Sequence, residues 1–63
     1  MKYLVGEARY QKRMSLRRLA EQARISKSYL QRIEAGEVSP SLEIMLRLAR
    51  VLEVPLEQLY REE

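Results

Sequence analysis

The sequence predicts an all-α domain of five short helices, and three observations support this prediction. Apolar residues recur at spacings of three and four positions along most of the 63 residues. Strand patterns are missing, since no stretch alternates as a strand does and the chain holds no aspartate or asparagine for a tight hairpin turn. Serine, proline and glycine stand where these helices need to begin and end. The length fits one domain over residues 1–63, close to the smallest size that folds alone.

The first helix is expected over residues 4–12, with Val5 and Ala8 on its inner face. Met14 is expected to fill the space between this helix and the next. The second helix is expected to begin at Ser15, because a serine hydroxyl is a good N-cap. Four apolar residues then share one face of that helix: Leu16, Leu19, Ala20 and Ala23. Both helices are therefore expected to pack against one core.

The third helix follows after a short link and is expected to run from a Ser26 cap to about Ala35. Its inner face carries Leu30 and Ile33, and Gly36 is placed to end the helix in a left-handed conformation. Two helices joined by so few residues form a helix-turn-helix arrangement.

The fourth helix is expected to open at Pro40 or Ser41 and to end before Pro55. Its apolar face comprises Leu42, Met45, Leu46, Ala49 and Leu52. A last short helix is expected to hold Leu56, Leu59 and Tyr60. About a dozen buried side chains, each contributing about 1.5–3 kcal/mol before conformational entropy is subtracted, suffice for a marginal core.

Basic residues gather in the first half of the chain. Residues 1–32 hold nine Lys or Arg against two Glu, a net charge of +7, whereas residues 33–63 hold three against seven, a net charge of −4. A chain polarised in this way presents a positive face to an anionic partner, either nucleic acid or an acidic membrane surface. An ordinary solvated surface is the plain alternative. A membrane-surface helix is disfavoured because the apolar faces are needed for the core.

The chain contains no cysteine and no histidine. This removes the usual metal ligands and the usual general base, and no glycine-rich phosphate loop is present. We therefore expect no enzyme, metal site, cofactor or small-molecule ligand. No apolar run is long enough to span a membrane, and the first residues do not form a signal peptide, so a cytoplasmic protein is expected.

Residues 15–36, SLRRLAEQARISKSYLQRIEAG, resemble the Cro/repressor-type (Xre-like) helix-turn-helix family. The likeness continues through residues 39–42 and 48–56 and so covers almost the whole chain. It implies a five-helix lambda-repressor-like fold that binds double-stranded DNA as a homodimer on a palindromic operator and represses transcription. Two positions depart from the family pattern, since Leu16 stands where glutamine is frequent and Arg24 stands where glycine is usual.

The resemblance also implies roles for individual residues. The third helix would enter the major groove, where Lys27, Ser28 and Arg32 read base edges on a face without an acidic neighbour. The complete set of expected DNA contacts is Arg17, Ser26, Lys27, Ser28, Tyr29, Gln31, Arg32, Ser39 and Ser41. Tyr29 fits simple packing against the second helix equally well. Arg9 is implied to form a structural ion pair with Glu34 beneath the DNA face.

The homodimer surface is expected at Leu56, Leu59 and Tyr60, because these residues exceed what a short terminal helix needs for packing. At least one of the two leucines is expected to close the core of the monomer instead. An antitoxin-like or adaptor module of the same fold, which binds a protein through the acidic second half, is the alternative function.

Overall fold

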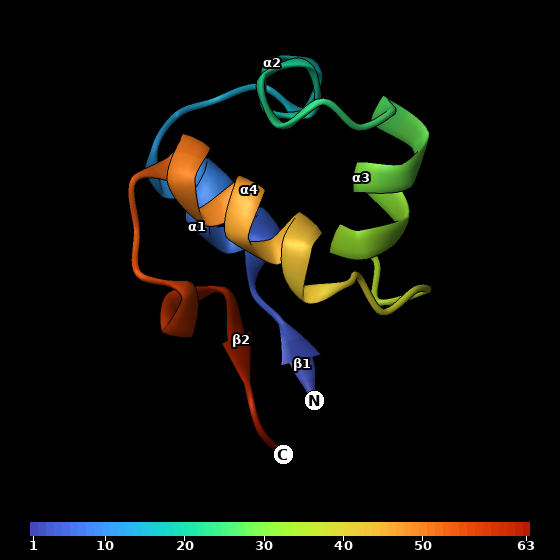
Figure 1. Cartoon of the computed structure of the whole chain (residues 1–63), viewed down its shortest axis with the longest axis vertical. Coiled ribbons are helices and arrows are strands. Elements are labelled where there is room, and N and C mark those ends of the chain that lie inside the picture. Colours follow the sequence, from blue (N-terminus) through green and yellow to red (C-terminus); the bar gives the residue numbers. More distant parts are fainter.

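The computed structural model describes all 63 residues as a small bundle of helices with a short ribbon at its ends (Figure 1). Four α-helices follow one another: α1 (Val5–Gln11), α2 (Leu16–Ala23), α3 (Lys27–Glu34) and α4 (Leu42–Leu52). A 3-10 helix, η1 (Leu56–Leu59), follows α4. Strands β1 (Lys2–Tyr3) and β2 (Tyr60–Arg61) pair antiparallel, so the two chain ends lie side by side.

The structure corrects the expected five-helix count. The last predicted helix is a single 3-10 turn, and Tyr60 lies in β2 rather than in that helix. In the ribbon Lys2 lies opposite Arg61 and Tyr3 opposite Tyr60, and the backbone N–H of Leu4 donates to the carbonyl of Leu59 at 2.8 Å. Strands of two residues are too short to show an alternating pattern, which is why the sequence did not predict them.

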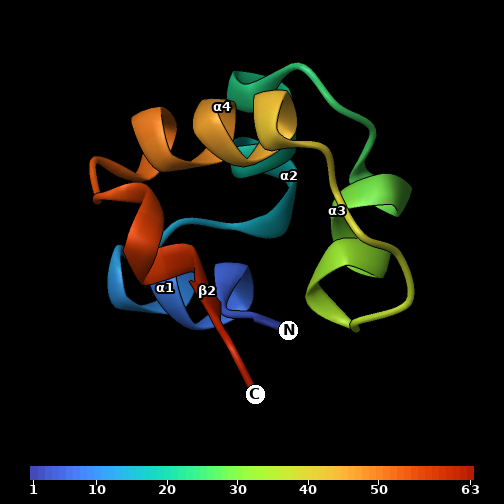
Figure 2. The ribbon, with the colours of Figure 1, turned by 60° about the horizontal axis from the view of Figure 1, so that its bottom comes forward.

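One apolar core joins all the helices. Its twelve members are Val5, Ala8, Leu19, Ala20, Ala23, Leu30, Ile33, Met45, Leu48, Ala49, Leu52 and Leu59. No charged side chain lies in this core, and no buried side-chain nitrogen or oxygen lacks a hydrogen-bond partner. Helix α2 packs against both α3 and α4, as Figure 2 shows from a second direction. The core therefore fixes the position of α3 relative to the rest of the molecule.

Four residues expected in the core lie farther out, among them Leu16, which is half-buried. Leu42 is 64% exposed and Leu46 is 38% exposed, because α4 is buried mainly through Met45, Leu48, Ala49 and Leu52. Met14 is half-buried and packs against the edge of the core. The helical spacing on α4 thus predicts a wider buried face than its neighbours cover.

Serine hydroxyls cap three of the helices. Ser15 Oγ accepts from the backbone N–H of Arg18 at 3.1 Å, at the start of α2. Ser26 and Ser41 do the same for α3 and α4, at 3.0 and 3.2 Å. A cap of this kind stabilises a helix by about 1 kcal/mol. These bonds confirm that α2 begins after Ser15. They also show that Ser41, rather than Pro40, caps the start of α4.

All four α-helices also end in the same way. Each ends at a residue with a left-handed backbone: Arg13 (φ 55°), Arg24 (φ 61°), Gly36 (φ 77°) and Glu53 (φ 57°). The N–H of the residue after it donates back to a helix carbonyl, at distances between 3.0 and 3.2 Å. The N–H of the left-handed residue itself also donates to a helix carbonyl, and the two bonds together form the Schellman motif. Three of the four left-handed positions lack glycine, and a non-glycine residue there costs about 1–2 kcal/mol.

Gly36→Ala is expected to lower the free energy of unfolding by about 1 kcal/mol. The reason is the backbone alone, since a Cβ at this position meets no atom within 4 Å. Urea unfolding of the two proteins measures the difference. Arg24→Gly relieves the same strain at the end of α2 and serves as the control, which should not destabilise the protein. Equal stability of Gly36→Ala and the parent would contradict the left-handed geometry.

No helix in the structure combines the length and the apolar character needed to cross a membrane.

Candidate nucleic-acid interface

Helix α3 presents a polar stripe to solvent while its opposite face is buried. Leu30 and Ile33 anchor that opposite face and are fully buried. The stripe consists of four exposed residues at helical spacing: Ser28, Gln31, Arg32 and Ala35. Together with Glu37 they line an open hollow of about 330 Å³. The outer face of α3 is thus shallow and polar, and the buried residues of its inner face fix the helix to the core.

The position of α3 leaves this stripe open. In Figures 1 and 2, α3 lies at one edge of the molecule, and no other helix covers its outer side. The major groove of B-form DNA is about 12 Å wide and admits one α-helix. A helix anchored on its inner face and free on its outer face has the shape that such a groove accepts.

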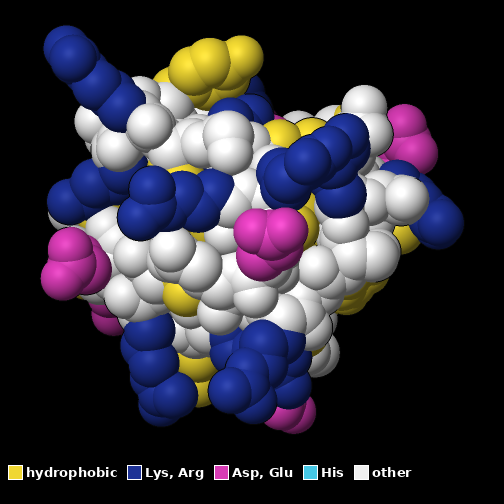
Figure 3. Space-filling view, turned by 90° about the horizontal axis from the view of Figure 1, so that it is seen from above, with side chains coloured by type: hydrophobic (Ala, Val, Ile, Leu, Met, Phe, Trp, Pro, Cys, Tyr) yellow, Lys and Arg dark blue, Asp and Glu magenta, His cyan; other side chains and the backbone are white.

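Basic side chains on α2 and α3 have no acidic partners. The protein contains three ion pairs, which are Arg9–Glu34, Arg47–Glu43 and Arg61–Glu63. Exposed Arg17, Arg18, Lys27 and Arg32 belong to none of them. Figure 3 looks onto the side where α2 lies, and Lys and Arg spread across that face between smaller, separate acidic patches. Unpaired cations on an exposed surface suit the phosphates of a nucleic acid.

The structure corrects one expectation about α3. Its outer face was expected to hold no acidic neighbour, yet Glu37 lines the same hollow as Arg32. A sequence signal for this placement exists. A glycine at the left-handed end of a helix folds the next residue back over the last turn, so Gly36 brings Glu37 towards Arg32. Ala35, exposed on the same stripe, was also not singled out from the sequence.

The other expected DNA contacts are distributed around this stripe. Lys27 is exposed at the first residue of α3, and Tyr29 is half-buried against the core. Ser26 and Ser41 hold helix caps with their hydroxyls. Ser39 is exposed and lines a separate hollow beside the end of α3. Only three of the nine expected contacts, Ser28, Gln31 and Arg32, therefore meet in one hollow.

The first turn of α2 shows how the departure at position 16 is accommodated. Leu16 is half-buried against the core, whereas Arg17 beside it is exposed and unpaired. An apolar side chain cannot bind a phosphate. Arg17 and Arg18 in this turn are both exposed and unpaired, so cations remain available for a phosphate at this end of α2.

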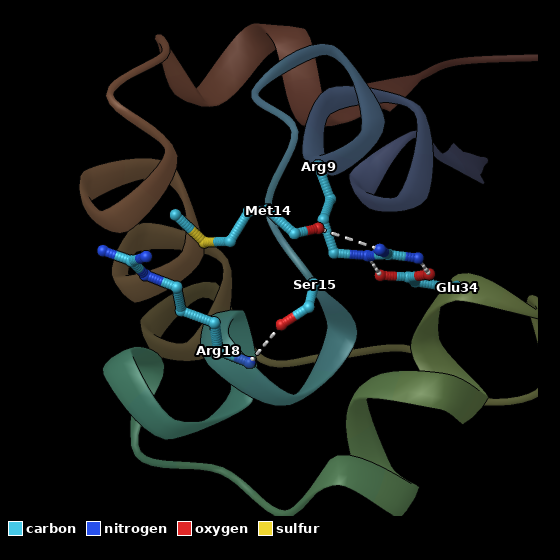
Figure 4. Close-up of polar contacts among 5 residues, drawn as sticks. All are labelled: Arg9, Met14, Ser15, Arg18 and Glu34. Carbon is cyan, nitrogen blue, oxygen red and sulfur yellow. Dashed lines mark hydrogen bonds and ion pairs between the residues drawn. The ribbon is translucent and has the colours of Figure 1, made fainter.

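The expected pairing of Arg9 with Glu34 is present and links α1 to α3 (Figure 4). Arg9 Nε donates to Glu34 Oε2 at 2.8 Å, Nη2 donates to Oε1 at 2.9 Å, and Nη1 donates to the carbonyl of Met14 at 3.0 Å. The two side chains are only 12% and 15% exposed. The hydrogen bonds to Glu34 raise the pKa of Arg9 above its ordinary value, against the opposing effect of burial.

Gly6 makes room for this pair. A Cβ at position 6 would lie 3.2 Å from Glu34 Oε1, so the absence of a side chain lets α1 approach the carboxylate closely. The pair neutralises the one acidic residue within α3. Because Glu34 is held by Arg9 in this two-bond geometry, α3 itself carries no free carboxylate that would weaken the positive potential around Lys27 and Arg32.

A second surface, on the side of the two chain ends, is apolar. A hollow of about 410 Å³ is lined by Met1, Tyr3, Pro40, Leu42, Met45, Leu56, Tyr60 and Glu62. Of the three residues expected in a dimer surface, Leu56 and Tyr60 are half-buried and line this hollow, whereas Leu59 is fully buried in the core. Leu59 is therefore the leucine that closes the monomer.

Comparisons with known proteins match this architecture. The helix-turn-helix family model matches residues 5–59. An uncharacterised HTH-type transcriptional regulator of Mycobacterium tuberculosis (strain H37Rv) is 38% identical over 47 residues, which are 75% of this chain and 34% of that protein. The chain thus spans about a third of the length of the curated relatives it matches.

Two solved structures show the same fold. The N-terminal DNA binding domain of SinR from Bacillus subtilis has a TM-score of 0.82 at 35% identity, covering 94% of this chain and 87% of that one. The restriction-modification controller protein C.AhdI from Aeromonas hydrophila has a TM-score of 0.84 at 30% identity, covering 89% and 85% of the two chains.

Proposed function

The chain belongs to the helix-turn-helix family of DNA-binding transcription regulators, and from this premise we propose that it represses transcription by binding a palindromic DNA operator in the cytoplasm. The observation that carries the proposal is the polar stripe of α3, which is rigidly anchored and bears unpaired Arg32. The family is a DNA-binding fold rather than a class of enzymes.

The proposed contacts divide into base reading and backbone positioning. Arg32 has the planar fork that hydrogen-bonds O6 and N7 of guanine, and Gln31 can bond adenine in the same two-bond manner. Lys27 and Ser28, near the N-terminus of α3, reach the neighbouring base edges. Phosphates are assigned to Arg17 and, around the start of α4, to Ser39 and Ser41, where helix amides add donors. Ser26, which caps α3, and Tyr29, which is half-buried, are proposed to make additional contacts beside these.

The proposed operator follows from a two-fold dimer. Two recognition helices related by such an axis read half-sites about 34 Å apart, one turn of DNA. We assign the dimer contact to the apolar hollow at the chain ends. Leu56 and Tyr60, expected from the sequence, line this hollow, and the exposed Leu42 lies there too. A second copy of this chain is the proposed occupant, because a two-fold contact places identical apolar patches against each other.

Selection of bound sequences from random duplexes, at one fixed salt concentration, tests the proposed function. We expect an enriched palindrome with half-sites one helical turn apart. Weak, salt-sensitive binding without any enriched sequence would reject the repressor function and favour a protein partner, as an antitoxin-like or adaptor module would have.

Arg17→Ala is expected to weaken binding to all DNA sequences alike, because the residue is assigned to a phosphate rather than to a base. Removing one phosphate contact makes the slope of log affinity against log salt shallower by about 0.9. Titrations at several salt concentrations measure this slope. Arg50→Ala, which removes an equal charge from the exposed side of α4, is the control and should leave the slope unchanged. An altered sequence preference for Arg17→Ala would contradict the assignment.

Leu42→Glu is expected to shift the protein from dimer to monomer by placing a carboxylate in the apolar hollow. The substitution costs little folding energy because Leu42 is 64% exposed in the monomer. Sedimentation equilibrium over a concentration range measures the shift. Leu46→Glu, the same change at a 38% exposed position of α4 outside this hollow, is the matched control. Equal association of both variants and the parent would place the dimer contact elsewhere.

A further inference from the structure

The four Schellman ends of this protein are alike except at one position. In three of them the residue after the left-handed one is apolar and half-buried against the core: Met14, Ile25 and Val54. In the fourth, at the end of α3, the corresponding residue is Glu37, which is charged and exposed. A hydrophobic contact usually accompanies this motif. Glu37 makes no such contact, so its exposed carboxylate is available to a group outside the protein.

The backbone fixes where that carboxylate lies. The N–H of Glu37 donates to the carbonyl of Arg32 at 3.0 Å, and the N–H of Gly36 donates to the carbonyl of Ile33 at 3.1 Å. These bonds fold the chain back against the last turn of α3, and Glu37 and Arg32 line the same hollow. No basic group lies within 4.0 Å of the Glu37 carboxylate, so it does not serve as an internal partner of Arg32.

A free carboxylate on a DNA-binding face must find a hydrogen-bond donor or repel the phosphates. Base edges in the major groove offer two amino donors, N4 of cytosine and N6 of adenine. Adenine also presents the N7 acceptor beside its amino group, which an ionised carboxylate cannot satisfy. Cytosine N4 is therefore the donor that matches Glu37.

We propose that Glu37 is a specificity-determining residue that accepts a hydrogen bond from the N4 amino group of a cytosine. This cytosine lies in the base pair next to the one whose guanine Arg32 reads. The proposal rests on the proposed DNA-binding function. In the major groove guanine presents two acceptors and cytosine one donor, and the hollow presents the complementary guanidinium donor and carboxylate acceptor side by side for two neighbouring base pairs.

The test compares sequence preferences of the full chain and three variants, Glu37→Ala, Glu37→Gln and Glu57→Gln, in the same random-duplex selection. Glu57→Gln removes an equal charge from η1, outside the α3 hollow, and is the matched control. Circular dichroism confirms folding, which is expected to persist because the Glu37 side chain is exposed and its backbone bond remains.

The parent is expected to prefer cytosine at one position of each half-site by about 10-fold, within the range that one base contact provides. Glu37→Ala should lose this preference, Glu37→Gln should shift it towards adenine, and Glu57→Gln should retain it. Unchanged preferences in both Glu37 variants would overturn the proposal. If binding to every sequence also tightened, Glu37 would act only by repelling phosphates. A parent protein that enriches no sequence would overturn the proposed function itself, and this proposal with it.

Discussion

Arg32→Ala is expected to lower affinity for the selected operator by about 10- to 100-fold per half-site and to relax the preference for guanine at one position. Its side chain lies at the centre of the exposed stripe of α3 and forms no ion pair in the protein. Two hydrogen bonds from one rigid guanidinium group to O6 and N7 distinguish guanine from the other bases. Fluorescence anisotropy with the operator and its single-base variants, at one salt concentration, measures both effects.

Two further substitutions separate base reading from simple charge. Arg32→Lys keeps the charge but loses the planar fork, so binding to random DNA should persist while the guanine preference falls. Arg50→Ala removes one charge from α4, outside the α3 hollow, and should change neither quantity by a comparable amount. A uniform loss of affinity in Arg32→Ala, with the guanine preference intact, would instead assign Arg32 to a phosphate.

The elements that the sequence predicts well are those fixed by neighbouring residues. Ser15 and Ser26 cap helices where their hydroxyls reach a backbone N–H three residues later, and Gly36 adopts the left-handed backbone that ends α3. Each of these outcomes depends on contacts within one turn of helix. Local chemistry therefore sets the helix-turn-helix unit, α2 and α3 with the turn between them.

The features that the sequence does not predict depend on distant contacts. The pairing of β1 with β2 requires the two chain ends to meet, which happens only after the helices have packed. Leu42 has the same spacing as its buried neighbours on α4, yet nothing covers it in the monomer. Helical periodicity shows which residues share a face, but the surrounding elements decide how much of that face is buried.

The residues of the candidate site also differ in whether local spacing or distant contacts determine their positions. The polar stripe of α3 follows from the helical spacing of Ser28 and Arg32 once α3 is placed. Glu37 lies outside the helix, and its position depends on the return of the chain after Gly36, which a search for helical spacing overlooks. Arg9 and Glu34 are 25 positions apart, so only the resemblance to a known family predicted their contact.

Breaking the pair of Arg9 and Glu34 is expected to have the largest effect on stability. Arg9→Met should lower the free energy of unfolding by about 3 kcal/mol, the lower end of the range for a buried pair, because both side chains retain slight exposure. The loss arises mainly from the carboxylate that remains without its partner. A domain of 63 residues has only about 3–9 kcal/mol of stability, so Arg9→Met would unfold at markedly lower temperature.

A double-mutant cycle isolates the contribution of the pair. Arg9→Met combined with Glu34→Leu removes both charges and should recover much of the stability that either single substitution loses. Glu43→Ala breaks an ion pair whose two side chains are 37% and 74% exposed, and as the control it should change stability by about 0.5 kcal/mol or less. Single substitutions no more costly than Glu43→Ala would show that the pair contributes little.

DNA binding by the double variant then separates two roles of Arg9. If Arg9 acts only within the protein, the double variant should bind the operator with the affinity of the parent once both are folded, because Lys27 and Arg32 remain in place. Arg9 Nη1 already donates to Met14, and the other two donors in contact are held by Glu34, so few of its N–H groups face outward. A folded double variant with weaker binding and a shallower salt dependence would instead mean that Arg9 also reaches a phosphate.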